Sequence, residues 1–238
     1  MRALVKRALV FGGSGAVGAF VVRGLARHSI ATTFTFLKAR EKAEALAAET
    51  GARAVSLDLR EPGAIRALIG SLDAEGAPEL FIHCAAVSRA AKLAEITADD
   101  WDTAVAVNCR AAFVACQELA PRFAKAGGGE VVLVGALDRG QSLPMPIHFA
   151  ASQGMLPAMA MALAKELGPL GARVNVVALG PLDSGMSASL PQKMMDDYRA
   201  FSALRRVGTP LEAARAILWL ALENRYVSGR VMAVNGGI

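Results

Sequence analysis

The glycine-rich stretch Ala8–Gly18, ALVFGGSGAVG, is the part of the sequence that most constrains the fold. A short apolar segment, Ala8–Phe11, leads through a tight turn into the amphipathic segment Ala16–Ala26. The turn has the spacing G-x-G-x-x-G, with glycines at Gly13, Gly15 and Gly18. Backbone N–H groups of such a loop, together with the positive end of the following helix, bind the pyrophosphate of a dinucleotide. The flanking strand and helix make the motif informative; the alternative is a tight turn that binds nothing.

Each glycine of the motif has a separate predicted role. Gly13 would allow the sharp turn, Gly15 would let a phosphate approach the backbone, and Gly18 would let the helix pack closely on the strand. We therefore expect the loop to contact a cofactor through Gly12, Gly13, Ser14, Gly15, Val17 and Gly18.

Predicted strands and helices alternate along the chain, a pattern typical of a parallel sheet with helices on both faces. The predicted strands are 8–11, 30–36, 53–57, 80–84, 130–134, 173–179 and 231–234. The predicted helices are 16–26, 40–50, a long helix capped by Thr97 that continues to Leu119, 148–167 and 210–222. The sequence thus predicts an α/β fold, a doubly wound parallel sheet forming a single domain over residues 1–238.

Composition narrows the class of protein further. The chain is 54% hydrophobic with a formal net charge of +5, which fits an acidic partner such as a nucleotide, coenzyme A or a carrier protein. It lacks the basic, aromatic-interleaved stripe of a nucleic-acid binder, and its three cysteines show no zinc-site spacing. We expect no membrane span and no metal, and we interpret the apolar residues before Phe11 as the first strand rather than a signal peptide. The prediction is a cytoplasmic protein.

Two basic residues, Lys38 and Arg40, lie where the second predicted strand ends. In dinucleotide-binding folds an acidic residue there binds the ribose 2′-hydroxyl, whereas basic residues accept a 2′-phosphate. No carboxylate precedes Glu41 in this stretch, which favours NADP(H) over NAD(H). The alternative is a pair of solvated surface charges.

Further cofactor contacts are expected where the third and fourth strands end. Asp58, followed by Leu59, would hold the adenine amino group, cap the next helix, or do both. After the fourth strand, Cys84 and the small residues Ala85 and Ala86 would let the cofactor ribose lie against the backbone. We interpret His83 and Cys84 as packing residues rather than as reactive groups.

Residues 180–205 are a predicted substrate lid, because the segment begins with a loop, 180–191, that contains Gly, Ser and Met. The residues expected to line the lid and pocket are apolar and adaptable: Leu143, Met145, Pro146, Met186 and Met194. Asn108 falls inside a predicted helix among apolar residues, where a buried amide needs hydrogen-bond partners.

The whole chain resembles the short-chain dehydrogenases/reductases, and among them the 3-oxoacyl-carrier-protein reductases. Besides the glycine loop, the resemblance rests on TADDWDTAVAVNCRAAF, LAKELGPLGARVNVVALGPLDS, LRRVGTPLEAARAILWLA and YVSGRVMAVNGG. It implies a Rossmann-type sheet of about seven strands with a nicotinamide cofactor across its carboxyl edge, near Gly180 and Ser184. It also implies a homodimer or homotetramer built on the helices around Asn108 and Met155–Leu167, and a small-molecule or carrier-bound acyl or polyketide substrate.

Three residues of the family's catalytic machinery are replaced. The family uses a serine that polarises the carbonyl, a tyrosine that donates the proton, and a lysine that lowers the tyrosine pKa and binds the ribose. In EVVLVGALDRGQSLPMPIHFAASQG these positions are Ala136, Phe149 and Gln153, whereas the asparagine that orders a relay water is retained as Asn108. Ala and Phe supply neither a hydrogen bond nor a proton, and Gln carries no charge. Pro157 removes the N–H that would reach the Gln153 carbonyl.

Three functions remain open at this point. One is an atypical reductase that uses His148, or a water held by Asn108 and Ser152, as its proton donor. A second is a non-redox dehydratase, isomerase or cyclase that uses His148, Asp138 and Arg139 beside the old site. A third is a silent or regulatory subunit of a hetero-oligomer with an active relative. The candidate catalytic residues are Asn108, His148 and Asp138, and the alternative for His148 is a surface or capping histidine.

Overall fold

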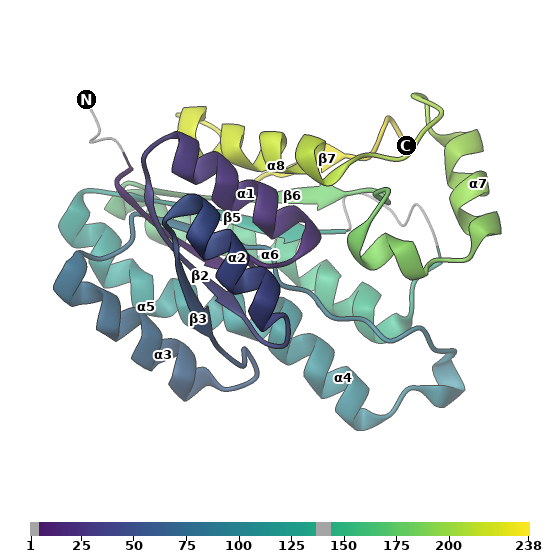
Figure 1. Cartoon of the computed structure of the whole chain (residues 1–238), viewed down its shortest axis with the longest axis horizontal. Coiled ribbons are helices and arrows are strands. Elements are labelled where there is room, and N and C mark those ends of the chain that lie inside the picture. Colours follow the sequence, from purple (N-terminus) through teal and green to yellow (C-terminus); the bar gives the residue numbers. More distant parts are fainter. Residues whose placement is uncertain (1–4, 137–143) are drawn as a thin grey trace.

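Seven parallel strands form one sheet in the computed structural model of the chain, which describes residues 5–136 and 144–238. Their order is β3-β2-β1-β4-β5-β6-β7 (Figure 1). The strands are β1 (Arg7–Phe11), β2 (Ala31–Phe36), β3 (Arg53–Ser56), β4 (Leu80–His83), β5 (Gly129–Gly135), β6 (Ala172–Leu179) and β7 (Val231–Val234). The order reverses between β1 and β4, at the switch point where open α/β sheets bind ligands. The predicted doubly wound, seven-stranded fold is confirmed.

Helices cover both faces of the sheet (Figure 1). One layer contains α1 (Ala16–Arg27), α2 (Arg40–Thr50) and α8 (Pro210–Leu218), and the other contains α3 (Pro62–Ser71), α4 (Ala98–Val105), α5 (Ala111–Ala126) and α6 (Ile147–Leu167). Because both faces are covered, the central strands are almost continuously apolar. Leu9 and Phe11 pack in the core under α3 and α5, whereas Val10 packs in the core under α1 and α2.

The predicted lid contains more helix than the sequence suggested. Residues 185–189 form a short 3-10 helix, η5 (Gly185–Ser189), and α7 (Gln192–Phe201) follows it. Tyr198 fixes α7 to the C-terminal segment, because its hydroxyl donates a hydrogen bond to the Asn235 carbonyl. Helix α7 was not among the predicted helices, and α3 is the helix expected after Asp58, for which no end was predicted. The remaining 3-10 helices are η1 (Leu72–Glu75), η2 (Leu93–Glu95) and η4 (Gly168–Leu170).

The helix predicted to start after Thr97 is interrupted. Its capping is as expected: the Thr97 hydroxyl accepts a hydrogen bond from the Asp100 N–H, and the Asp100 carboxylate accepts one from the Thr97 N–H. Between α4 and α5, however, the segment η3 (Ala106–Arg110) is π-helical, as is η6 (Trp219–Glu223) after α8. Such π-helical insertions are frequent at functional sites, and η3 carries Asn108.

Helix α6 is long and apolar, which differs from the expectation that no segment could span a membrane. By length and composition alone, Ile147–Leu170 is long and apolar enough to span a bilayer, although the sequence was expected to contain no such run. In the fold this helix packs on the sheet, with Leu156 and Ala160 in the core beside Val174. A core helix of an α/β protein passes the same test, and we interpret α6 in that way.

Candidate functional site

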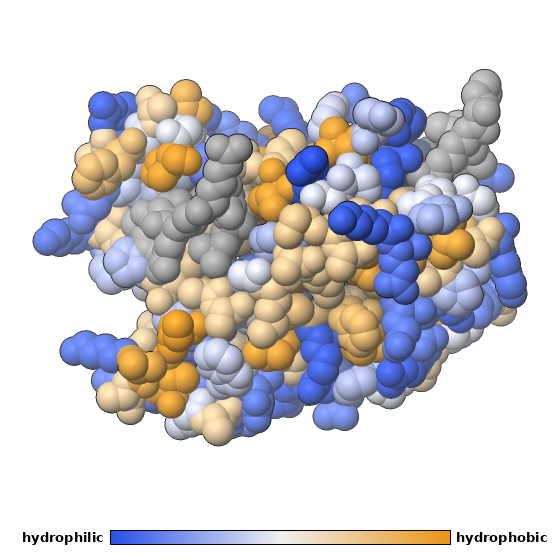
Figure 2. Space-filling view, turned by 180° about the vertical axis from the view of Figure 1, so that it is seen from behind, coloured by the Kyte–Doolittle hydropathy of each residue, from blue (hydrophilic) through white to orange (hydrophobic). Residues whose placement is uncertain are grey.

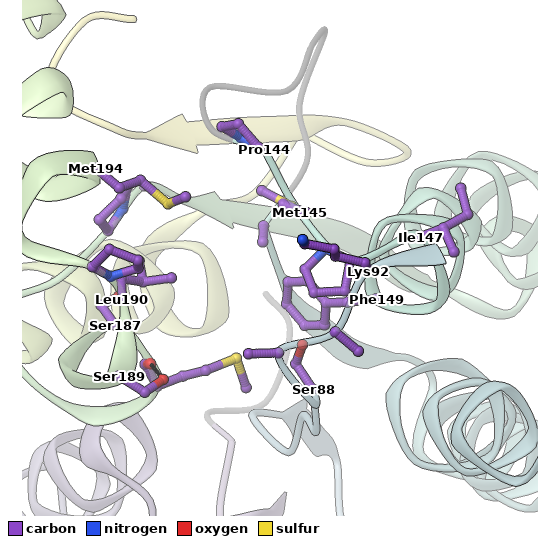
Figure 3. A pocket seen from close by; sticks show the side chains of 18 of the residues that line it. Ser88, Lys92, Pro144, Met145, Ile147, Phe149, Ser187, Ser189, Leu190 and Met194 are labelled. Atoms are coloured by element: carbon purple, nitrogen blue, oxygen red, sulfur yellow. Dashed lines mark hydrogen bonds between the residues drawn. The ribbon is translucent and has the colours of Figure 1, made fainter. Parts of the chain in front are cut away.

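Two cavities adjoin at the carboxyl edge of the sheet. The first, the dinucleotide cleft, has a volume of about 600 Å³ and is lined by the glycine loop, the segment after β4 and the segment after β6. The second, the apolar cavity, has a volume of about 830 Å³ and lies between segments 88–93, 144–149 and 186–194 (Figure 3). The residues that line both are Ser88, Ala136, Phe149, Leu179, Gly180, Met186 and Ser187.

The glycine loop that lines the dinucleotide cleft depends on close backbone packing. A Cβ atom on Gly18 would overlap the Gly12 carbonyl oxygen, so only glycine lets α1 pack this closely on the loop, as predicted. The sharp turn, in contrast, lies at Gly12, whose φ is +73°, and not at Gly13. Gly13 is required for another reason, since its Cβ would lie 2.5 Å from the Phe34 Cβ.

The N-terminal end of α1 is suited to bind an anion. Gly15 is the N-cap, the helix has no side-chain cap and no acidic residue in its first turn, and Val17 lines the cleft with Gly15. The unpaired N–H groups and the positive end of the helix dipole therefore remain available to a phosphate. Ser184 lines the same cleft from the far side, and Gly185 approaches Ala16 so closely that a Cβ there would lie 2.8 Å from the Ala16 Cβ.

The predicted adenine and 2′-phosphate contacts lie outside the cavities just described. Lys38 and Arg40 are exposed after β2, and Arg40 forms a salt bridge of 3.4 Å with Glu44. Asp58 accepts two-pronged hydrogen bonds from the Arg60 guanidinium, which hold the pKa of its carboxyl below the usual range. Asp58 does not cap α3, because the N-cap residue is Glu61 and no side chain caps that helix.

The residues at the end of β4 and just after it serve for packing and are not reactive. Cys84 and Ala86 line the dinucleotide cleft, Ala85 packs against the core, and Leu59 is buried. Burial raises the pKa of the Cys84 thiol to about 12, which keeps it protonated and unreactive. Burial also lowers the pKa of His83 to about 4, and its Nε2 lies 3.3 Å from the Asn108 carbonyl oxygen.

The three replaced positions meet at the boundary of the two cavities. Phe149 is buried and lines both of them, and Ala136 lies on the same boundary. Figure 3 shows Phe149 in the apolar cavity. Gln153 is buried in the dinucleotide cleft, where its Oε1 accepts a hydrogen bond of 3.0 Å from the Ala136 N–H. Its Nε2 is buried without a partner among the described residues.

Asn108 is retained, but its side-chain amide is fully engaged. Its Oδ1 accepts a hydrogen bond of 2.7 Å from the Val87 N–H, and its Nδ2 donates to the Val87 carbonyl at 3.0 Å and to the Ser152 hydroxyl at 2.9 Å. The Ser152 hydroxyl in turn donates to the Phe149 carbonyl at 2.9 Å. Neither Asn108 nor Ser152 lines either cavity. Their bonds hold segment 87–89 against α6 instead of facing a substrate.

His148 lies away from the apolar cavity although Ile147 and Phe149 line it. Its ring is buried, and its Nε2 accepts a hydrogen bond of 3.4 Å from the Arg89 N–H. The predicted catalytic role of His148 therefore has no geometric support, and its buried position also differs from the surface alternative. Asp138, Arg139 and Leu143 lie outside the described residues.

Segment 87–93 is the part of the site that sequence reasoning missed. Its residues Ser88 and Lys92 line the apolar cavity together with Met145, Met186 and Met194, which were expected there. The signal in the sequence was the Arg89-to-Asp100 spacing: Arg89 forms a two-pronged salt bridge with Asp100, which ties the segment to the capped start of α4.

Residues 14–238 match the family model described as enoyl-(acyl carrier protein) reductase. The chain belongs to the short-chain dehydrogenase/reductase family. The cyclic-di-GMP-binding biofilm dispersal mediator protein of Escherichia coli K12 is 32% identical over 97% of this chain and 96% of its own length. The 3-oxoacyl-[acyl-carrier-protein] reductase FabG of Chlamydia muridarum is 26% identical over 98% of this chain and 97% of its own length.

Solved structures agree with this placement. BdcA in complex with NADPH has a TM-score of 0.88 and 30% identity, covering 98% of this chain and 94% of that one. A blue fluorescent protein from a metagenomic library, also in complex with NADPH, has a TM-score of 0.87 and 31% identity, covering 100% and 99% of the two chains. Members of the family that resemble this chain over its whole length thus include both named reductases and a protein named for ligand binding.

Proposed function

We propose that this protein binds NADP(H) and holds an apolar ligand beside the nicotinamide, in a single domain with residues 180–205 as its lid, but does not carry out the acid-assisted carbonyl reduction of its reductase relatives. The observation that carries the proposal is the boundary of the two cavities. Ala136, Phe149 and Gln153 supply no ionisable proton donor there, and the only acceptor oxygen among their side chains is engaged by the Ala136 N–H.

The residues of the dinucleotide cleft fit NADP(H). The glycine loop and the uncapped start of α1 suit the pyrophosphate, and the unpartnered Gln153 Nε2 suits a ribose hydroxyl. Lys38 and Arg40 suit a 2′-phosphate. When bound, the cofactor supplies hydride chemistry; the chain's own residues bind and orient it. Two similar structures, each in complex with NADPH, support this part of the proposal.

No described tyrosine or histidine takes the place of the missing tyrosine. Of the two tyrosines in the chain, Tyr198 donates its hydroxyl to Asn235 and Tyr226 is 98% exposed outside both cavities. Of the three histidines, none lines either cavity. Because a positioned acid or base contributes about 10²–10⁴ in rate and an oxyanion donor about 10²–10³, ordinary carbonyl reduction should be slower by several orders of magnitude.

These observations favour a binding or regulatory role over the other two functions. A substitute donor at His148 or at an Asn108-bound water is not supported, because neither side chain lines either cavity and the Asn108 amide is engaged by Val87 and Ser152. A non-redox enzyme would need a pair of acid–base groups in the apolar cavity, and its described lining contains one ionisable side chain, Lys92, with no carboxylate or imidazole beside it. The relative named for binding and dispersal supports such a role on this fold.

The helical face opposite Figure 1 supports a homo-oligomer. Phe113 on α5 and Met155 and Met161 on α6 are exposed. Figure 2 shows apolar residues across the middle of the side of the molecule that Figure 1 hides. We infer a cytoplasmic homodimer or homotetramer that uses this face; pairing with an active relative is the alternative. Size measurement of the purified protein, alone and mixed with such a relative, separates the two.

The test restores the lost groups. NADPH binding is measured by calorimetry and nicotinamide fluorescence, and NADPH oxidation is followed with acetoacetyl-CoA. The variant Ala136→Ser/Phe149→Tyr/Gln153→Lys should gain at least about 100-fold in rate over the native chain. The matched control Ala136→Ser/Gln153→Lys, which lacks only the phenol, should stay near the native rate. A native rate equal to that of the triple variant, or no NADPH binding at millimolar concentration, would show the proposal to be wrong.

A further inference from the structure

The apolar cavity has one described charged group. Its described lining is otherwise made of aliphatic and thioether side chains, Pro, Gly, Ala, Phe149 and three serines, and the charged residue is Lys92. Figure 3 shows the Lys92 side chain extending from segment 88–93 into the cavity, close in the view to Met145 and Phe149. A volume of about 830 Å³ is in the range of pockets that enclose a small organic ligand.

The carboxylates nearest to Lys92 in the sequence are engaged by other groups. Glu95 accepts a hydrogen bond of 3.0 Å from the Lys92 backbone N–H through its Oε2, and Asp100 is paired with Arg89. Lys92 itself forms no salt bridge with any carboxylate in the part of the chain that the structure describes. The ammonium group is thus available to an anion that enters with a ligand.

The segment that carries Lys92 is held in place at several points. Asn108 binds both the N–H and the carbonyl of Val87, and His148 accepts the Arg89 N–H. The Arg89 guanidinium binds Asp100 and also donates to the Glu95 carbonyl. A cation on a preorganised segment loses less freedom on binding than one on a free loop.

We propose that the apolar cavity binds an aliphatic carboxylic acid, with its chain among Met145, Met186 and Met194 and its carboxylate paired with Lys92. This inference rests on the proposed function, since it names the ligand class of the same cavity. Three methionines on different segments adapt to chains of different shape, whereas the single cation selects the charge of the head group. In this arrangement the aliphatic chain of the ligand supplies most of the affinity, and Lys92 supplies the selectivity for the head group.

The experiment compares three ligands that differ only in the head group. Decanoate, decanol and decylamine are titrated into the NADPH-loaded protein by calorimetry, below their aggregation concentrations. Decanoate should bind about two- to fivefold more tightly than decanol, and decylamine most weakly, as expected for one partly exposed ion pair. In Lys92→Met, decanol affinity should persist and the preference for decanoate should disappear. Lys92→Gln serves as a second variant if Lys92→Met fails to fold.

Two control variants keep the assignment specific. Lys193→Met removes an exposed cation that lines a neighbouring hollow but not the apolar cavity, and it should leave the preference unchanged. Arg139→Gln removes a basic residue that lies outside the described residues. If the preference for decanoate is lost in Arg139→Gln but kept in Lys92→Met, the inference is overturned. Equal binding of decanoate and decanol to the native chain also overturns it. NADPH binding without decanoate binding refutes only this inference, whereas absent NADPH binding refutes the proposed function.

Discussion

The two cavities that meet at Phe149 differ in what they are made of. The glycine-loop wall of the dinucleotide cleft is shaped by backbone, because side chains at Gly12, Gly13 or Gly18 would collide with Ala85, Phe34 or Gly12. The apolar cavity is shaped by side chains, and at its boundary Ala136 and Phe149 stand where the family carries proton-transfer groups.

The difference shows how one family supports different functions. A site made of backbone is fixed by the fold, since changing it disturbs the packing of α1 on β1 and β2. A site made of side chains changes by substitution while the fold remains. Gln153 and Asn108 show that a side chain can stay polar and buried while its role changes, because each now binds neighbouring protein groups.

The largest expected effect tests whether Asn108 has become a structural residue. Asn108→Ala leaves the Val87 N–H and carbonyl and the Ser152 hydroxyl without their present partner. Since three hydrogen bonds at about 0.5–1.5 kcal/mol each are lost and the truncated side chain leaves a cavity, the free energy of unfolding should fall by about 4 kcal/mol in urea titrations. Gln117→Ala, on an exposed face of α5, should change little. A loss below about 1 kcal/mol would mean that Asn108 is not the anchor of segment 87–89.

The second prediction concerns pH and the buried His83 beneath the same segment. Burial depresses its pKa from 6.5 to about 4, so the folded state holds it neutral while the unfolded state takes up a proton below pH 6.5. Its contribution is complete above pH 6.5 and is lost as the pH falls to 4, by about 3 kcal/mol. His83→Asn should flatten the pH dependence of unfolding in this window, and the exposed His28→Asn should not. Identical slopes in His83→Asn and the native chain would contradict the prediction.

The third prediction sharpens the backbone side of the comparison. Gly18→Ala places a methyl group against the Gly12 carbonyl, whereas Gly63→Ala, on α3, places one in open space. The first should destabilise the protein by about 2 kcal/mol and remove the rise in melting temperature that NADPH produces. Gly63→Ala should retain that rise. A Gly18→Ala variant that NADPH still stabilises normally would show that close packing at Gly18 does not shape the cleft.

Local patterns in the sequence predicted the fold and the cleft, whereas long-range contacts decided the rest. The glycine loop and the apolar strands are continuous in sequence, so their places in the sheet followed from spacing. His148 could not be oriented in this way, because successive residues of a helix differ by about 100°, and Ile147 and Phe149 line the cavity whereas His148 between them does not. Lys92 was missed because its position depends on contacts between Val87 and Asn108, which are 21 residues apart.

The smallest expected effect concerns the exposed charges after β2. If Lys38 binds a 2′-phosphate, Lys38→Gln should weaken NADPH binding about threefold, as for an exposed ion pair, and leave NADH binding unchanged. Arg40→Gln should add a similar factor, reduced by the competing Glu44 carboxylate. Arg27→Gln, at the exposed end of α1, controls for the general loss of positive charge. Because the ratio of the two dissociation constants cancels changes in folding, an unchanged ratio in the double variant would place 2′-phosphate recognition elsewhere in the chain.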